Sequence, residues 1–150
     1  MKRNENLIPL SREHHYGLLC VWKIREGVKK NIEFDRIKNY IDFFWQNHLE
    51  NHFETEEKSF PVLENDALND QMEKEHKNLR QLVNNLNCTK DYNVLTDFAN
   101  ALNDHIRFEE RTLFPQYESS FTESELAEIG EKIREYSHEF SDNYEDEFWK

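Results

Sequence analysis

A motif of histidine, glutamate, phenylalanine and proline occurs twice in this chain, about fifty residues apart. HFETEEKSFP spans residues 52–61, and HIRFEERTLFP spans residues 105–115. In each copy a histidine precedes a glutamate by four residues, which puts both side chains on one face of a helix. The two pairs are His52 with Glu56 and His105 with Glu109. Imidazole nitrogen and carboxylate oxygen are both good ligands for divalent first-row metals, so the repeat indicates a metal site.

Two other amphipathic segments place histidines near apolar residues. His76 lies on the same helical stripe as Leu79 and Val83, and an earlier segment contains the adjacent histidines His14 and His15. Taken singly, such a histidine is usually a core residue that is hydrogen-bonded to a carbonyl. Burying four imidazoles and two carboxylates without a cation would cost on the order of several kcal/mol per ionised group. Their coincidence on four segments therefore favours a metal centre over ordinary packing.

The ligand types narrow the choice of metal. A structural zinc site is closed and tetrahedral and often contains thiolates, whereas Cys20 and Cys88 occur singly, away from the ligand stripes. Four imidazoles and two carboxylates are too many for one tetrahedral ion. They suit two octahedral ions that share the carboxylates, as iron or manganese would. The residues therefore predict two metal ions, iron or manganese, and leave zinc possible.

The elements that must position these residues are helices. Apolar periodicity and stop signals predict four long helices, over residues 11–30, 35–60, 66–86 and 91–114. Ser11 is expected to cap the first helix, and Pro61 and Pro115 to end the second and the fourth. Four amphipathic helices with short connections predict an all-α protein, an up-down-up-down four-helix bundle.

An additional helix is expected after the bundle. Thr122 and Glu125 have the spacing of a capping box, and the apolar residues that follow recur at helical spacing. A C-terminal helix over about residues 122–148 should therefore pack across the outside of the bundle, with an acidic tail, SDNYEDEFWK, that frays. The length of 150 residues predicts a single domain, 1–150, with its bundle at about 7–117.

Composition argues against several classes of function. The formal net charge is -12 and the isoelectric point about 5.0, and such a chain repels phosphate backbones and anionic lipid headgroups. The apolar run near the amino terminus is too short for a signal peptide or a membrane span. We therefore expect a cytoplasmic protein with no nucleic-acid partner and no membrane association.

The four histidine-containing segments together resemble the hemerythrin-like domain, also called the HHE cation-binding domain. The resemblance covers nearly all of residues 7–117 and is carried by LSREHHYGLL, HFETEEKSFP, EKEHKNL and HIRFEERTLFP. It implies a four-helix bundle that holds a non-haem di-iron centre. It also implies that His52, His76 and His105 are terminal ligands and that Glu56 and Glu109 bridge the two irons.

The remaining ligand comes from the first helix, where His14 and His15 are alternatives. Apolar residues follow His15 at the same offsets as they follow His76, and this register favours His15. Against this, the dipeptide Glu13-His14 copies Glu75-His76, and His14 lies nearer the apolar side of the helix. The other histidine would then have a supporting role.

Several neighbouring residues are expected to support the site. His48 lies one turn before His52 and should face the same interior. Glu57 and Glu110 directly follow the bridging glutamates, but a step of one residue turns a side chain by about 100 degrees, so they are expected to be solvated or supporting residues. Oxygen-carrying hemerythrins have another ligating histidine where this chain has Arg80, which would bind an anion or a glutamate if it points inward.

The resemblance implies a protein that binds, senses or reacts with a small diatomic or peroxide ligand: O2, NO or hydrogen peroxide. Without the extra histidine of the oxygen carriers, more metal coordination positions should be open, which favours reactivity over reversible storage. The alternative is a protein that binds, buffers or senses iron without turnover. A partner protein or electron donor is not indicated by the sequence.

Overall fold

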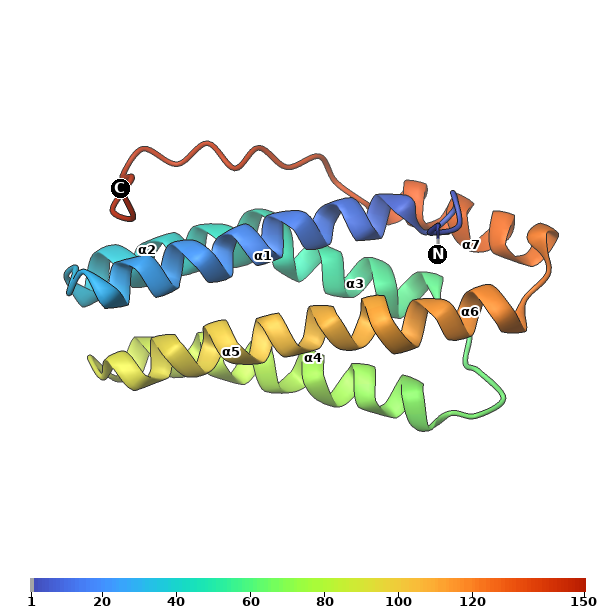
Figure 1. Cartoon of the computed structure of the whole chain (residues 1–150), viewed down its shortest axis with the longest axis horizontal. Helices are drawn as coiled ribbons and strands as arrows, with labels where there is room; N and C mark the ends of the chain where they lie inside the picture. The colour runs from blue at the N-terminus through green and yellow to red at the C-terminus, as the bar shows by residue number, and fades with distance from the viewer. Residues whose placement is uncertain (1) are drawn as a thin grey trace.

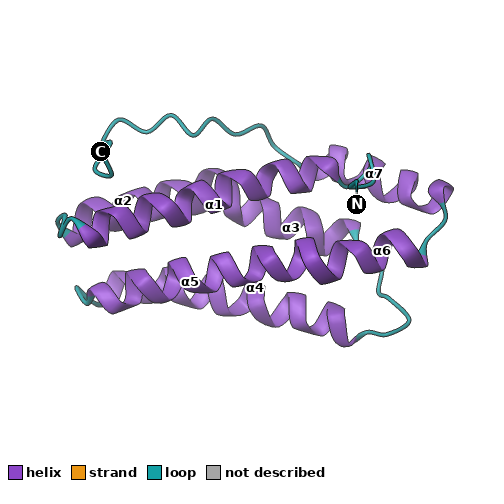
Figure 2. Cartoon of the chain, in the orientation of Figure 1, coloured by secondary structure: helices purple, strands orange, loops and turns teal. Residues whose placement is uncertain are grey.

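The computed structural model describes residues 2–150, and within that range the protein contains helices and no strands (Figures 1 and 2). The predicted all-α class and four-helix bundle with an additional helix are confirmed. The elements in chain order are α1 (Ile8–Lys29), α2 (Phe34–Phe44), the π-helical turn η1 (Trp45–Leu49), α3 (Glu50–Ser59), α4 (Ala67–Asn85), the short 3-10 turn η2 (Leu86–Cys88), α5 (Tyr92–Phe108), the π-helical turn η3 (Glu109–Leu113), α6 (Phe114–Ser120) and α7 (Glu123–Tyr136).

The bundle consists of two antiparallel hairpins. α2, η1 and α3 form one continuous helix that runs back along α1, while α5, η3 and α6 form another that runs back along α4 (Figure 1). α1 packs most extensively on α5, and α7 packs on α3. None of the helices among residues 2–150 is both long and apolar enough to cross a membrane.

Two separate apolar clusters fill the interior, one near each end of the bundle. The first includes Ile24, Tyr40 and Phe98, and the second includes Leu10 and Tyr117. Each of the four long helices passes from one cluster to the other, and each carries a buried histidine in between. The apolar clusters therefore hold the helices together on both sides of a polar layer.

The first helix begins earlier than expected. It starts at Ile8, with Pro9 in its first turn and Leu7 at the N-cap position, which makes no side-chain cap hydrogen bond. Proline is well suited to a first turn because its missing N–H would have no helical partner there. The assignment of Ser11 as the N-cap was wrong: its hydroxyl lies within the helix and donates to a Glu110 carboxylate oxygen at 2.8 Å.

Pro61 and Pro115 behave differently although they close the same motif. α3 ends at Ser59, as the prediction for Pro61 required, but the chain passes through Pro115 and remains helical to Ser120. The second copy of the motif is one residue longer than the first, and its helix makes the π turn η3 within the motif. There the N–H of Phe114 donates to the carbonyl of Glu109, five residues back. A π turn thus absorbs the additional residue.

The same π turn explains how a proline is accommodated inside the fourth helix. Pro115 has no N–H, so the carbonyl of Glu110, five residues back, loses the donor that the π pattern would give it. The Nη2 atom of Arg3 donates to that carbonyl at 2.8 Å. The expected helix end at Phe114 was therefore wrong, because a side chain from the N-terminal segment satisfies the freed carbonyl.

The C-terminal helix is shorter than expected, and the tail after it is ordered. The capping box of Thr122 and Glu125 is present, but α7 ends at Tyr136 instead of near residue 148. The residues that follow are rich in Ser, Asn and Asp, whose side chains compete with helical backbone hydrogen bonds. The tail runs extended along the bundle towards the turn between α1 and α2 (Figure 1).

Aromatic burial and a buried ion pair hold this tail in place. Phe148 and Trp149 are 2% and 8% exposed, and Asp142 accepts from Lys23 at 2.8 Å and from the Tyr40 hydroxyl at 3.0 Å. The expectation of a fraying tail was wrong because aromatic residues at its end fill the groove between α1 and α2.

Replacing Phe148 with alanine should lower the free energy of unfolding by about 3 kcal/mol, because a fully buried phenyl ring is removed from a packed cluster. Urea unfolding followed by circular dichroism measures the change. Val62→Ala is the control, since Val62 is 70% exposed, and it should unfold like the parent protein. Equal stability of all three proteins would contradict the packed tail.

Candidate metal centre

Six ionisable side chains from all four bundle helices meet in the polar layer between the apolar clusters. Each is at most 4% exposed, and together they are His14 on α1, His52 and Glu56 on α3, His76 on α4, His105 on α5 and Glu109 on η3. The helical spacing explains the pairs, because residues four apart project from the same face.

The Nε2 atoms of the four imidazoles face the two carboxylates. His14 Nε2 lies 2.8 Å from Glu109 Oε1, and His105 Nε2 lies 3.3 Å from Glu109 Oε2. Around the other carboxylate, His76 Nε2 and His52 Nε2 lie 3.1 Å and 3.4 Å from Glu56 Oε1. Each carboxylate is therefore flanked by imidazoles from two different helices.

These donors form two overlapping groups. His14 and His52 form one group with Glu56 and Glu109, and His76 and His105 form the other with the same two glutamates. Within each group the ligand atoms lie within 4.8 Å of one another. Each group could hold a metal ion, and the two groups have both carboxylates in common.

The hydrogen-bonding state of these atoms also fits a cation. Among the described residues, the Nε2 atoms of His52, His76 and His105, both oxygens of Glu56 and Oε2 of Glu109 are buried without a hydrogen-bond partner. Buried polar atoms are normally hydrogen-bonded, and a buried carboxylate without a partner is costly. Nitrogen and oxygen atoms that converge without partners are the donor set a divalent metal needs.

Each imidazole also contacts a second carboxylate through its other nitrogen, Nδ1. His14 Nδ1 lies 2.6 Å from Glu110, and His76 Nδ1 lies 2.8 Å from Glu57. A carboxylate at Nδ1 fixes the ring orientation and keeps the proton on that nitrogen, which leaves the Nε2 lone pair for a metal.

The other two histidines also face carboxylates, at different distances. His105 Nδ1 is hydrogen-bonded to Glu75 at 2.7 Å, whereas His52 Nδ1 lies 3.5 Å from Glu13 without a hydrogen bond. In every case the carboxylate and the ring come from neighbouring helices, so the pairs link α1 to α3, α3 to α4, α4 to α5, and η3 back to α1. The four pairs therefore form a closed ring around the site.

The electrostatics of the site follow from these contacts. Burial lowers the pKa of His76, but its contacts with Glu109, Glu56 and Glu57 raise it more, to about 10. Burial likewise lowers the pKa of His105, and Glu109 and Glu75 raise it to about 9. Burial raises the pKa of Glu109, but the surrounding imidazoles, with His105 the strongest, hold it well below the usual range. A cation that binds here must therefore displace protons from the imidazoles.

The structure chooses between the two histidines of the first helix. His14 is 4% exposed and reaches the cluster, whereas His15 is exposed on the opposite side of α1. The preference for His15 was wrong because the apolar register was compared with residues that are themselves exposed, including Leu18 and Trp22. The copied dipeptide, Glu13-His14 and Glu75-His76, was the reliable signal.

Glu57 and Glu110 lie beside the cluster and support it, as their one-residue offset from Glu56 and Glu109 implied. Arg80 does not enter the cluster, since its guanidinium donates to both oxygens of Glu57 at 2.9 and 3.0 Å. Burial raises the pKa of Glu57, but His76 and Arg80 together lower it to about 2, which keeps it ionised.

His48 is buried beside the cluster, as expected. It stacks on Phe140 of the C-terminal tail with 4.6 Å between ring centroids, and its Nδ1 lies 3.8 Å from Glu13. Burial lowers the pKa of His48 to about 4, so its ring is neutral at pH 7. The role of Phe140 could not be predicted because this residue was expected in the C-terminal helix, which ends at Tyr136.

A small cavity adjoins the cluster. It has a volume of about 10 Å³ and is lined by His14, His52 and His105 together with Glu13, Gly17, His48, Leu49, Phe53, Leu102 and Ile106. That is room for about one water-sized molecule. A Cβ atom at Gly17 would lie 2.6 Å from the Ile106 side chain, so glycine permits the close approach of α1 and α5 here.

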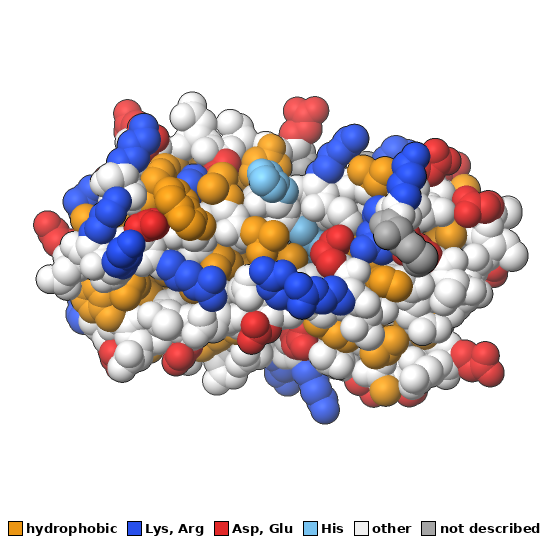
Figure 3. All heavy atoms as spheres, in the orientation of Figure 1, with side chains coloured by type: hydrophobic (Ala, Val, Ile, Leu, Met, Phe, Trp, Pro, Cys, Tyr) orange, Lys and Arg blue, Asp and Glu red, His pale blue; other side chains and the backbone are white. Residues whose placement is uncertain are grey.

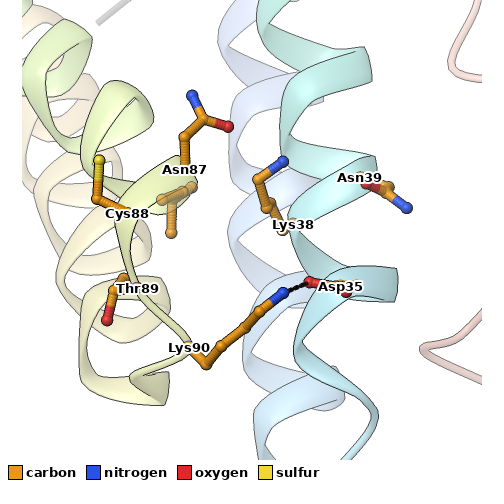
Figure 4. Close-up of a pocket in the computed structure, with 8 residues that line it drawn as sticks. Asp35, Lys38, Asn39, Asn87, Cys88, Thr89 and Lys90 are labelled. Atoms are coloured by element: carbon orange, nitrogen blue, oxygen red, sulfur yellow. Dashed lines mark hydrogen bonds and ion pairs between the residues drawn. The ribbon is translucent and has the colours of Figure 1, made fainter.

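A much larger hollow lies elsewhere. It has a volume of about 620 Å³ and lies between the beginning of α2 and the loop after α4, where Lys90 pairs with Asp35 (Figure 4). It is open to solvent, and its lining residues are mostly polar, with the exposed thiol of Cys88 at its edge. None of the six clustered side chains lines it, so its size does not make it the functional site.

The fold and the clustered donors define a helical-bundle metal-binding protein. The family model for the hemerythrin HHE cation-binding domain matches residues 10–117, well over half of the chain. The chain therefore belongs to the hemerythrin HHE family, whose domain binds metal cations. Searches of curated proteins and of solved structures found no match.

Replacing His14 with alanine should lower the amount of tightly bound metal, because it removes a buried ligand atom from one of the two donor groups. His15→Ala is the matched control and should bind like the parent protein, since His15 is exposed. Metal stoichiometry after dialysis against a weak chelator distinguishes the two. Loss of metal from the His15 variant alone would reverse the assignment.

Replacing Glu57 with glutamine should weaken metal binding about 10- to 100-fold, because the amide no longer supports the Nδ1 proton of His76 as a carboxylate does. Competition with a chromophoric chelator measures the affinity. Glu54→Gln lies on the same helix and is exposed, so it should leave the affinity unchanged. An unchanged affinity in Glu57→Gln would show that Glu57 does not tune the site.

Proposed function

We propose that this centre holds two iron ions and that the protein binds, senses or reacts with a small molecule such as O2, NO or a peroxide. The observation that carries the proposal is the pair of donor groups that share Glu56 and Glu109. Glutamates and histidines that project inward from the helices of a bundle are how di-iron carboxylate proteins hold two metals close together.

The donor set supports iron as the metal. It contains imidazoles and carboxylates only, and the thiol of Cys20 is buried in the apolar cluster nearer the α1–α2 turn. A donor set of nitrogen and oxygen atoms that is large enough for octahedral coordination suits iron or manganese better than it suits a tetrahedral structural zinc. Iron supplies redox chemistry when bound, which zinc does not.

The number of ligands supports a small-molecule partner. Two octahedral ions have about twelve coordination positions, of which two shared carboxylates and four imidazoles occupy about eight. The adjoining cavity of about 10 Å³ limits what can approach to very small molecules. Leu49, Leu102 and Ile106 keep bulk water from this side of the cluster, while His48 and Glu13 provide the polar edge.

One observation favours a second function, the binding, buffering or sensing of iron without turnover. All six donors are buried, and the apolar clusters close the layer from both ends. Such enclosure slows metal exchange and would suit storage as well as reaction. The two functions differ in whether a small ligand changes the metal centre.

Metal analysis and the ultraviolet-visible spectrum of protein purified aerobically without chelator test the proposal. We expect about two irons per chain and near-ultraviolet charge-transfer absorption, both lost in His52→Ala. Addition of azide or NO should then shift the spectrum, and an unchanged spectrum would favour iron binding without turnover. Zinc at substoichiometric levels, or no metal in either protein, would refute the di-iron centre.

A further inference from the structure

The solvent-facing side of α1 differs from the rest of the molecule in charge. Every exposed residue of α1 lies on a stripe with three- or four-residue steps, and none is acidic: Arg12, His15, Leu18, Trp22, Arg25 and Lys29. The whole chain has 31 acidic and 19 basic residues. We call this stripe the basic face. An acidic protein thus exposes one helix face of the opposite sign.

The centre of the basic face is apolar. Leu18 and Trp22 are 37% and 48% exposed, and they are two of the three large apolar side chains exposed among the described residues. The third, Val62, lies in the loop before α4. An exposed tryptophan beside arginines is typical of the residues that contribute most to protein–protein binding.

The neighbouring helix carries charges of both signs. Arg25 donates to Asn100 of α5 at 2.9 Å, and the exposed residues further along α5 and η3 include Arg107 and Arg111 as well as Asp104. Figure 3 shows Lys and Arg side chains in a row along the α1 and α5 side, next to apolar side chains and a histidine. The exposed face without acidic residues is therefore that of α1 alone, where Arg12, Arg25 and Lys29 lie on both sides of the apolar centre.

The basic face lies close to the metal centre. His15 is the residue directly after His14, whose ring reaches Glu109 on the other side of α1. An α-helix with its side chains is about 10 Å thick, so only this helix separates a molecule bound here from the proposed ligands.

We propose that the basic face is the docking surface of a small acidic electron-transfer protein that delivers electrons to the metal centre. The inference rests on the proposed redox function of that centre. Two apolar side chains within a charged rim suit the small, transient interfaces of redox encounters, and opposite charges steer the partners together.

The charges argue against two other occupants. In a symmetric pair of copies, α1 would face α1 with Arg12, Arg25 and Lys29 of both chains close together, and like charges across an interface are unfavourable. An anionic membrane is a broad surface that would also meet the acidic residues around the basic face, since the whole chain has a net charge of -12, whereas a small acidic protein can contact the basic face alone.

The first test is binding to an oxidised, acidic plant-type [2Fe–2S] ferredoxin, measured by isothermal titration calorimetry at low and high salt. We expect binding that weakens with salt. The double variant Arg12→Glu, Arg25→Glu and the single variant Trp22→Ala should each weaken binding about tenfold or more. The matched control is Lys77→Glu, Lys132→Glu, which reverses two exposed lysines on α4 and α7 and should bind as well as the parent.

The second test is anaerobic stopped-flow reduction of the iron-loaded protein by reduced ferredoxin, with dithionite as a small reductant. The Arg12, Arg25 variant should react at least about tenfold more slowly with ferredoxin and at an unchanged rate with dithionite. Equal rates in this variant and the lysine control would overturn the docking surface. The docking proposal would also be overturned if sedimentation velocity showed that the parent protein is a dimer and that Trp22→Ala is a monomer. A second copy of the chain would then occupy the basic face.

Failure of the proposed function gives a different result. If dithionite does not change the absorption spectrum of the iron-loaded protein, the redox function of the centre is refuted. The delivery of electrons to that centre is then refuted as well. Salt-dependent binding that Trp22→Ala weakens would then still identify a docking surface for an acidic protein. Absence of binding with normal dithionite reduction refutes the docking surface alone.

Discussion

Two carboxylates without contact with solvent are the constraint on which the rest of this structure depends. Glu56 and Glu109 are fully buried in the middle of a four-helix bundle, where an uncompensated ionised group costs on the order of several kcal/mol. Four imidazoles face them, and each imidazole contacts a further carboxylate at its edge. Apolar clusters at both ends keep the four helices close enough for these contacts. The surrounding histidines, the supporting carboxylates and the apolar clusters thus all serve to accommodate two buried acidic side chains.

The π turns keep the buried residues in register. A step of four residues overshoots a full α-helical turn by about 40 degrees, so a long series at this spacing drifts away from the core. The wider π turn reduces the drift. Each π turn lies within such a series of buried residues: Tyr40, Phe44, His48, His52 and Glu56 around η1, and His105, Glu109, Leu113 and Tyr117 around η3.

The sequence predicted the features that depend on local spacing. The His–Glu pairs, the helices that carry them and the capping box of Thr122 could all be found because helical periodicity relates residues three or four apart. Two of the failures have one cause in common, which is contact between distant segments. Pro115 stays inside a helix because Arg3 satisfies a carbonyl, and the tail is ordered because Phe148 and Trp149 reach a groove formed by the first hairpin. Neither contact can be predicted from residues that are close together in the sequence.

The two hairpins contribute corresponding residues to the ring of histidine–carboxylate pairs. Glu13-His14 and Glu75-His76 face corresponding partners, and so do the two histidine–glutamate–glutamate motifs, although Glu13 lies 3.5 Å from His52 and Glu75 only 2.7 Å from His105. Either hairpin alone contains two imidazoles, one shared carboxylate and two supporting carboxylates. Two copies of one hairpin about a twofold axis would therefore contain every group of the complete centre. The site has the composition of a symmetric dimer interface, and the loop between α3 and α4 joins its two halves into a single molecule.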